Sequence, residues 1–415
     1  MLAVVGAPRA AAVTLPANFT QSTYGTALGP VTAMAFAPDG RLFVAAQDGT
    51  VRIVKSTGTV ATPFVKLAVD HQGERGLTGI AIDPNFATNG YVYLYYATAT
   101  APIHNTVSRL VADGDVAQRV DGVPVQTTIF DLEASSTTAN IHNGGAMDFG
   151  TDGKLYVAVG DNARGANGQS MTTTFGKLLR INRDGTIPTD NPFYATATGP
   201  ARAIYSLGLR NPFTFGIQPG SGRTFINDVG ASTWEEINEA KRGSNHGWSL
   251  TEGPTTDPRF ASPIYAYHHT TGTVTGCAIT GGTFYNPESA RYPADYLGDY
   301  FFADFCGHWI KRFDPATGTV TNFAGSTAIH PVDLKVGPDG NLYYLSRGTS
   351  SVIRVNYTAS LAPTIDTHPA DQTVSAGDPV TFSVEATGAG LSYQWQRDDV
   401  DIAGATSESL RLAAV

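Results

Sequence analysis

The stretch AMAFAPDGRLFVAAQDGTVRIV (residues 33–54) indicates how most of this chain folds. It contains two apolar alternating runs joined by a Pro-Asp-Gly turn, and a third run after Asp-Gly. Alternation with a period of two places successive side chains on opposite faces of a β-strand. Because Asp-Gly and Pro-Asp-Gly favour tight turns, the stretch predicts consecutive antiparallel strands.

The same pattern recurs in five further segments, and helical periodicity of any length is absent; the segments are 76–97, 145–161, 213–230, 279–313 and 332–355. A lone antiparallel sheet cannot bury both faces, whereas sheets stacked around an axis cover one another. We therefore predict an all-β chain with a six-bladed β-propeller, closed by a strand from residues 18–28 that pairs with the last blade. A β-sandwich is the alternative, and it accounts less well for six matching units.

The two ends of the chain differ from the repeats. Residues 1–16 resemble the remnant of a secretory signal, or form a disordered Ala-rich end. The propeller is expected over residues 17–357, followed by a Pro-, Ala- and Thr-rich linker at 358–370. Residues 371–415 have alternating strands with Trp395 in the middle of one, which predicts a truncated immunoglobulin-like module. We expect that module to be poorly packed, because part of its sheet is missing.

Composition excludes several classes of function. The net charge is −9 and basic residues are not clustered, which argues against a nucleic-acid partner. The sequence contains no stretch of about 18 apolar residues that would suggest a membrane span. No strand–GxGxxG–helix unit suggests a nicotinamide or flavin site, and no GxSxG motif suggests a hydrolase. Cys277 and Cys306 are the two cysteines, either free buried thiols or, in an exported protein, a disulfide.

Five segments, in this order, carry motifs of one known family: GERGLTGIAIDPNF (73–86), HNGGAMDFGTDGKLYVAVGD (142–161), GKLLRINRDGTIPTDNPF (176–193), IYSLGLRNPFTFGI (204–217) and EEINEAKRGSNHGW (235–248). Together they resemble the soluble glucose/sorbosone dehydrogenases, quinoproteins that use pyrroloquinoline quinone (PQQ) on a six-bladed propeller. The resemblance implies a secreted or periplasmic enzyme that oxidises an aldose sugar at C1 with PQQ and Ca²⁺.

The resemblance assigns three catalytic residues. His142 matches the general base, which takes the proton of the anomeric hydroxyl while hydride passes to the quinone. Imidazole suits this role because its ordinary pKa lies near working pH. Asp161 matches a carboxylate that orients the base, and Arg210 matches an arginine that polarises a quinone oxygen. The alternative for His142 is an ordinary loop histidine, and the alternative for Arg210 is a structural arginine that donates to carbonyls of a neighbouring blade.

Further residues correspond to cofactor-side positions. Asn211 follows Arg210 in the family's RNP element, and Thr273 matches a threonine that touches the cofactor. Glu74 lies where relatives have a polar group on the substrate side, or is a solvated turn carboxylate.

The resemblance also implies calcium. Gly230 and Ala231 fall where relatives present backbone carbonyls to the ion beside the quinone, and Ca²⁺ accepts such ligands readily. Glu236 matches a glutamate that holds a second, structural calcium; the alternative is a plain surface carboxylate.

The chain departs from the family where relatives bind the three carboxylates of PQQ. Relatives place a lysine and two arginines there, because a desolvated anion must be paired. Here those positions fall near Cys306, His330 and Val332, and Val229 replaces a glutamine. Three nearby cations could substitute for the missing ones, but their strand context favours ordinary blade positions: Lys311, Arg312 and Arg347.

These departures keep a second function open. It is a calcium-bearing propeller without catalysis, which binds a cell-surface glycan or a protein, since an appended immunoglobulin-like module is typical of adhesion proteins. Cys277 and Cys306 fall on expected strands of one blade, and similar cysteines occur in relatives that resemble hedgehog-interacting proteins, which are binding modules. We therefore hypothesise a Cys277–Cys306 disulfide.

Overall fold

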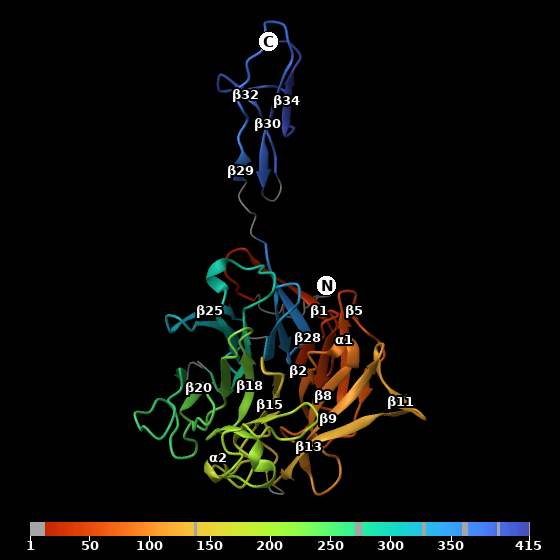
Figure 1. Cartoon of the computed structure of the whole chain (residues 1–415), viewed down its shortest axis with the longest axis vertical. Helices are drawn as coiled ribbons and strands as arrows, with labels where there is room; N and C mark the ends of the chain where they lie inside the picture. The colour runs from red at the N-terminus through yellow and green to blue at the C-terminus, as the bar shows by residue number, and fades with distance from the viewer. Residues whose placement is uncertain are drawn as a thin grey trace, which may run out of the picture. The chain divides into compact units, whose positions relative to one another are not determined.

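The computed structural model describes residues 13–136, 139–269, 276–325, 329–358, 364–387 and 391–414. By its contacts the chain divides into two compact units, residues 1–357 and 358–415. The first unit contains six antiparallel sheets arranged as the blades of a propeller (Figure 1). In the described part of the chain, no helix has the length and apolar character needed to span a membrane.

Blades 1 to 3 follow one another along the chain, and in each the first-named strand lies at the axis. Blade 1 comprises β2 (Val31–Phe36), β3 (Leu42–Ala46), β4 (Thr50–Lys55), β5 (Gly58–Thr59) and β6 (Val65–Lys66). Blade 2 comprises β7 (Leu77–Ile82), β8 (Tyr91–Ala97), β9 (His104–Asp113), β10 (Val116–Ala117) and β13 (Gln126–Ala134). Between β10 and β13 is a hairpin of β11 (Arg119–Val120) and β12 (Val123–Pro124). Blade 3 comprises β14 (Met147–Phe149), β15 (Leu155–Val159), β16 (Lys177–Ile181) and β17 (Ile204–Leu207).

Blades 4 to 6 complete the ring. Blade 4 comprises β18 (Pro212–Ile217), β19 (Thr224–Asp228), β20 (Trp234–Ala240) and β21 (Tyr265–His268). Blade 5 comprises β22 (Ile279–Phe284), β23 (Tyr300–Asp304), β24 (Trp309–Asp314) and β25 (Thr319–Gly325). Blade 6 comprises β26 (Pro331–Val336), β27 (Leu342–Ser346), β28 (Ser351–Tyr357) and β1 (Phe19–Gly25). The helical elements described are short: α1 (Phe86–Asn89), α2 (Ala166–Gln169) and two 3₁₀ turns, Gly199–Ala203 and Ala294–Tyr296.

The ring is closed by the N-terminal strand. β1 pairs antiparallel with β28, with Phe19 opposite Tyr357, so the last blade combines strands from both ends of the propeller. The predicted closing strand within residues 18–28 is confirmed, and each of the six repeats contributes strands to a different blade. The inner strands contact one another in sequence and β26 contacts β2, which completes the circle.

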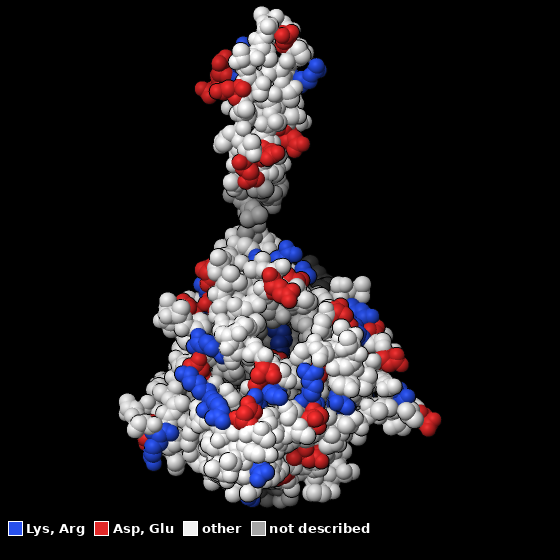
Figure 2. Space-filling model, in the orientation of Figure 1, with Lys and Arg blue, Asp and Glu red and all other residues white. Residues whose placement is uncertain are grey.

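Apolar side chains between neighbouring sheets hold the blades together. Six clusters of buried hydrophobic residues occur, each between two adjacent blades. Between blades 2 and 3, for example, the buried Tyr93 and Tyr95 belong to the same cluster as Leu155 and Val157. Each sheet therefore buries both faces, which is the physical reason for radial repetition. Figure 2 shows that acidic and basic side chains are interspersed around a central hollow on the visible face.

Residues 13–16 differ from the expectation of a signal remnant or a disordered end. Thr14 forms a β-bridge with Gly325 of blade 5, and its N–H donates to the Gly325 carbonyl at 3.0 Å. Val13 and Leu15 pack against the cluster between blades 5 and 6. These four residues are therefore part of the propeller, while residues 1–12 lie outside the described residues.

The second unit contains short strands: β29 (Thr364–Thr367), β30 (Val380–Ser383), β31 (Glu385–Thr387), β32 (Gln396–Arg397), β33 (Val400–Asp401) and β34 (Ser409–Leu412). β29 lies inside the range expected as a linker and pairs with β31. Trp395 donates from Nε1 to the Ser407 carbonyl at 2.9 Å. Among the described residues of this unit, Val380 is the one buried hydrophobic side chain, so the unit has little core of its own.

Candidate active site

A histidine–carboxylate pair lies in the loops around β14 and β15. His142 Nδ1 is 2.7 Å from Asp161 Oδ1, and the side chains are 12% and 1% exposed. An ionised carboxylate can only accept, so Nδ1 carries the proton in this contact. Nε2 is then the ring atom that can take a proton from a substrate. The structure thus brings together the two residues that the sequence predicted as base and orienting acid.

Three further groups fix Asp161. Trp248 donates from Nε1 to Oδ2 at 2.8 Å, and the Ala163 N–H donates to Oδ1 at 2.8 Å. The backbone N–H of Asp161 donates to the Arg210 carbonyl at 2.7 Å. Trp248 was missed as a site residue, although it ends the NHGW element of the fifth family-like segment. Asp161 and Trp248 are 87 positions apart, so no local pattern shows that they touch.

The backbone at His142 adopts a strained conformation, with φ of 57°, and Glu74 helps to hold it. The His142 N–H donates to Glu74 Oε2 at 2.7 Å, so Glu74 supports the His142 backbone and also borders the axial cavity. At Gly145, with φ of 124°, an added Cβ would lie 2.2 Å from Thr78 Oγ1. This glycine is therefore required by the close approach of blade 2.

Arg210 and Asn211 are anchored by a buried acid. Their N–H groups donate to the Asp228 carboxylate at 2.9 and 2.7 Å. Burial, with the nearby Glu236 charge, raises the pKa of Asp228 to about 8. Arg210 Nη1 donates to the Val229 carbonyl at 2.9 Å, and its guanidinium lies 5.7 Å from the centroid of the Trp248 ring. The guanidinium thus bonds to a backbone carbonyl of its own blade, whereas the structural alternative expected carbonyls of a neighbouring blade.

An axial cavity of about 240 Å³ opens beside these groups. Its apolar wall includes Val31, Phe213, Val229, Phe305 and Val332, and its charged lining residues are Glu74 and Arg347. Asn211 also lines it and accepts from the Gly144 N–H at 3.2 Å through Oδ1. The interpretation of Arg347 as an ordinary blade position is wrong, because this side chain borders the cavity. Lys311 and Arg312 do lie within β24 of blade 5.

The loop at Gly230 and Ala231 is organised by a carboxylate that the sequence did not reveal. Glu252 Oε1 accepts from the four successive N–H groups of residues 231–234 at 2.8 to 3.2 Å. Burial raises the pKa of Glu252, but these N–H bonds lower it by more, so it lies below its ordinary value. With the N–H groups directed at Glu252, no backbone N–H of the described loops bonds to the carbonyls of Gly230 or Ala231. Such carbonyls are free to coordinate a cation.

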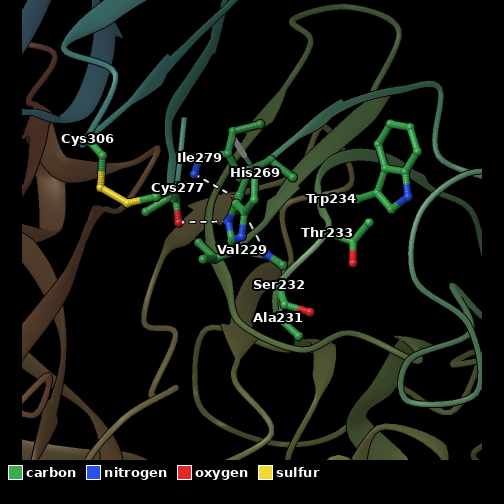
Figure 3. Close-up of polar contacts among 12 residues, drawn as sticks. Val229, Ala231, Ser232, Thr233, Trp234, His269, Cys277, Ile279 and Cys306 are labelled. Carbon is green, nitrogen blue, oxygen red and sulfur yellow. Dashed lines mark hydrogen bonds and ion pairs between the residues drawn. A yellow bond between two sulfur atoms is a disulfide. The ribbon is translucent and has the colours of Figure 1, made fainter. Parts of the chain in front are cut away.

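A buried acid and the disulfide lie next to this loop. Glu235 is fully buried, and burial raises its pKa to about 8. His269 Nε2 contacts Glu235. It also lies 3.0 Å from the Cys277 carbonyl (Figure 3). Cys277 and Cys306 form a disulfide with their Cα atoms 5.6 Å apart, which confirms the hypothesised pairing. Cys306 therefore brings no charge to the position where relatives have lysine.

Glu236 and Thr273 are the remaining predicted site residues. Glu236 pairs across the strands with Asp228, is 8% exposed, and accepts from Asn238 Nδ2 at 2.9 Å. It is a buried carboxylate whose pKa burial raises, not a plain surface group. In the described residues, no group of three or more His, Cys, Asp or Glu is arranged to hold a metal. Thr273 lies outside the described residues.

The sequence of this chain is similar to those of known sugar dehydrogenases. The family model described as Glucose / Sorbosone dehydrogenase matches residues 29–354. Aldose sugar dehydrogenase YliI of Escherichia coli is 27% identical over 333 residues, covering 77% of this chain and 87% of the relative. Quinoprotein glucose dehydrogenase B of Acinetobacter calcoaceticus is 27% identical over 60% of this chain and 56% of its own length, so the chain spans just over half of that relative.

A solved structure gives the same result. An oxidoreductase of the glucose dehydrogenase type from Thermus thermophilus superposes with a TM-score of 0.69 and 27% identity, over 81% of this chain and 99% of that one. The fold, the order of the motifs and the family match agree. The chain belongs to the glucose/sorbosone dehydrogenase family of PQQ-dependent sugar dehydrogenases.

Proposed function

We propose that this protein is an exported quinoprotein that oxidises an aldose at C1, with His142 as the general base. The single observation that carries the proposal is the 2.7 Å contact between His142 and Asp161, which leaves Nε2 as the proton acceptor. The family match and the relatives named as aldose and glucose dehydrogenases support it. A disulfide fits an oxidising compartment, which supports secretion or a periplasmic location.

The axial cavity fits a flat, anionic cofactor. Phe213, Phe305, Val31 and Val332 give it an apolar wall suited to an aromatic ring, and Arg347 gives it a permanent cation. Asn211 and Arg347 would hold PQQ, and the carbonyls of Gly230 and Ala231 would hold Ca²⁺ beside it. When bound, the quinone supplies the two-electron acceptor for the hydride that leaves C1.

The residues of this chain provide the proton chemistry. His142 Nε2 takes the proton of the C1 hydroxyl as the carbonyl forms, which turns the imidazole into an imidazolium. Asp161 stabilises that cation through Nδ1, and the hydrogen bond from Trp248 keeps the carboxylate oriented. Glu74 holds the backbone of the base in its strained conformation. The overall step removes one proton and one hydride from the sugar and gives the lactone.

Dye reduction tests this function. Purified protein is loaded with PQQ and Ca²⁺ and offered a panel of aldoses. We expect turnover with the wild type, a fall of about a hundredfold or more in kcat for His142→Asn, and normal turnover for the control His104→Asn on β9. No dye reduction at saturating PQQ and Ca²⁺ would instead favour a propeller that binds a glycan or protein without catalysis.

A further inference from the structure

Arg347 presents a permanent cation to the axial cavity from just after β27. Its Nη1 donates to the carbonyls of Val31 and Pro30 at 3.0 and 3.2 Å, and its Nη2 donates to Gln47 Oε1. These acceptors are all neutral. They aim the guanidinium from blade 6 across the gap to blade 1 and fix it against the cavity, but they leave its charge uncompensated.

No carboxylate of the described residues is paired with Arg347. Burial alone lowers the pKa of this guanidinium, with no acidic neighbour acting against it. The other charged lining residue, Glu74, is engaged by the N–H of His142. A partly desolvated charge without a counterion is costly, and an anionic ligand would remove that cost. The unpaired cation therefore indicates which end of the cavity receives a negative group.

Two imidazoles adjoin this end of the cavity. The Arg347 N–H donates to the His330 carbonyl at 3.1 Å, which places the two residues side by side on blade 6. The His330 ring meets the rings of His308 and Phe305 at centroid distances of 4.1 and 5.2 Å, and Phe305 lines the cavity. The buried Nδ1 atoms of both histidines lack a hydrogen-bond partner among the described residues. An imidazole N–H can donate to a carboxylate.

We propose that Arg347 is the carboxylate-binding residue of the axial cavity, with His330 and His308 beside it, and that it takes a carboxylate of PQQ. The assignment rests on the proposed function. It explains how a chain with Val332 and a disulfide-bonded Cys306 can receive an anionic cofactor. Pro331 of β26 pairs with Ser346 of β27. Val332 and Arg347 are the next residues after this pair, so both lie at the same end of blade 6. One of the missing cations is thus supplied by the residue that directly follows the neighbouring strand β27 of the same sheet.

Equilibrium binding tests the assignment without any turnover. Apo protein with Ca²⁺ is titrated with PQQ by isothermal titration calorimetry. Arg347→Gln should weaken binding by about tenfold or more, because a charge-assisted hydrogen bond is lost. Arg347→Lys should weaken it less, since the charge stays. The matched control is Arg354→Gln on β28, which removes a cation that is paired with Asp339 and does not line the cavity; it should bind PQQ as the wild type does.

The neutral trimethyl ester of PQQ separates charge from fold. The wild type should bind the ester more weakly than PQQ, and Arg347→Gln should bind both ligands alike. Equal affinity of the wild type and Arg347→Gln for PQQ would overturn the assignment and leave the proposed function standing. If Arg347→Gln does not fold, equal affinity of the wild type for acid and ester would overturn it. No PQQ binding by the wild type would overturn the proposed function and this assignment with it.

Discussion

At the scale of single residues, the site is a set of side chains whose partners are remote in sequence. The contact between His142 and Asp161 could be predicted, because both residues lie in one motif. Trp248 and Glu252 could not be predicted, because each contacts a residue on another loop, and Arg347 was assigned to an ordinary blade position because its contact with blade 1 exists only in the closed ring. Trp248 reaches Asp161 from the next blade, and Arg347 reaches Gln47 from 300 positions away.

Trp248→Phe tests whether the indole N–H positions Asp161 for the proposed reaction. The ring is kept, so packing is preserved, but the 2.8 Å hydrogen bond to Asp161 is lost. We expect kcat for aldose oxidation to fall by about tenfold, the value of one hydrogen bond to a charged group, with KM little changed. Steady-state kinetics with Trp309→Phe as control measure this. A variant with wild-type kcat would show that Ala163 alone suffices to orient Asp161.

His246 makes stability depend on pH. It is 4% exposed, and burial lowers its pKa to about 4. Between pH 6.5 and 4 the unfolded chain therefore binds a proton at His246 that the folded chain does not bind. The contribution of the neutral His246 to the free energy of unfolding is therefore complete above pH 6.5 and is lost as the pH falls towards 4. The slope from this one residue is up to about 1.4 kcal/mol per pH unit.

His246→Gln should flatten this dependence. Urea unfolding of wild type and variant at several values between about pH 4 and 7 measures it, and the difference between the two curves isolates the histidine from other titrating groups. Parallel curves would mean that His246 protonates in the folded state without cost.

At the scale of elements, turn residues and apolar alternation were sufficient to predict the strands and the blades. Pro-Asp-Gly and Asp-Gly placed the hairpins, and the six repeats became six blades with the closing strand where it was expected. Residues 13–16 were misjudged because an Ala-rich stretch has no pattern that reveals the bridge from Thr14 to Gly325. The fold could thus be predicted from local sequence patterns. The arrangement of charged side chains in the site could not, because it depends on contacts between different blades and loops.

The disulfide links the segment just before β22 to the segment just after β23 in blade 5. It closes a loop with a sequence separation of 29, so it should contribute roughly 3 kcal/mol by limiting the unfolded chain. Cys277→Ser with Cys306→Ser should lower the free energy of unfolding by that amount. Urea denaturation measures the loss, and reducing the wild type with dithiothreitol should reproduce it. An unchanged midpoint in both cases would show that the bond does not constrain the unfolded state.

At the scale of the whole molecule, stability and function depend on the same closure. The axial cavity exists only while all inner strands meet, and Arg347 contacts blade 1 across the junction that β1 seals. Every blade buries its faces against two neighbours, so no blade is expected to unfold alone. Loss of the closing strand should therefore remove the ring and the site together.

Phe19→Ala tests this coupling. Phe19 lies on β1 among four aromatic rings, Tyr292, Tyr296, Phe323 and Tyr357, at centroid distances of 4.8 to 5.4 Å. Truncating a buried phenylalanine costs about 3 kcal/mol or more, and we expect the whole propeller to lose that stability in one transition. Fluorescence and near-ultraviolet circular dichroism should report the same midpoint, and Val123→Ala on the exposed hairpin should change it little, within about 0.5 kcal/mol. Two separated transitions would instead show that β1 detaches while the rest of the propeller stays folded. The stability of the ring would then not depend on its closure.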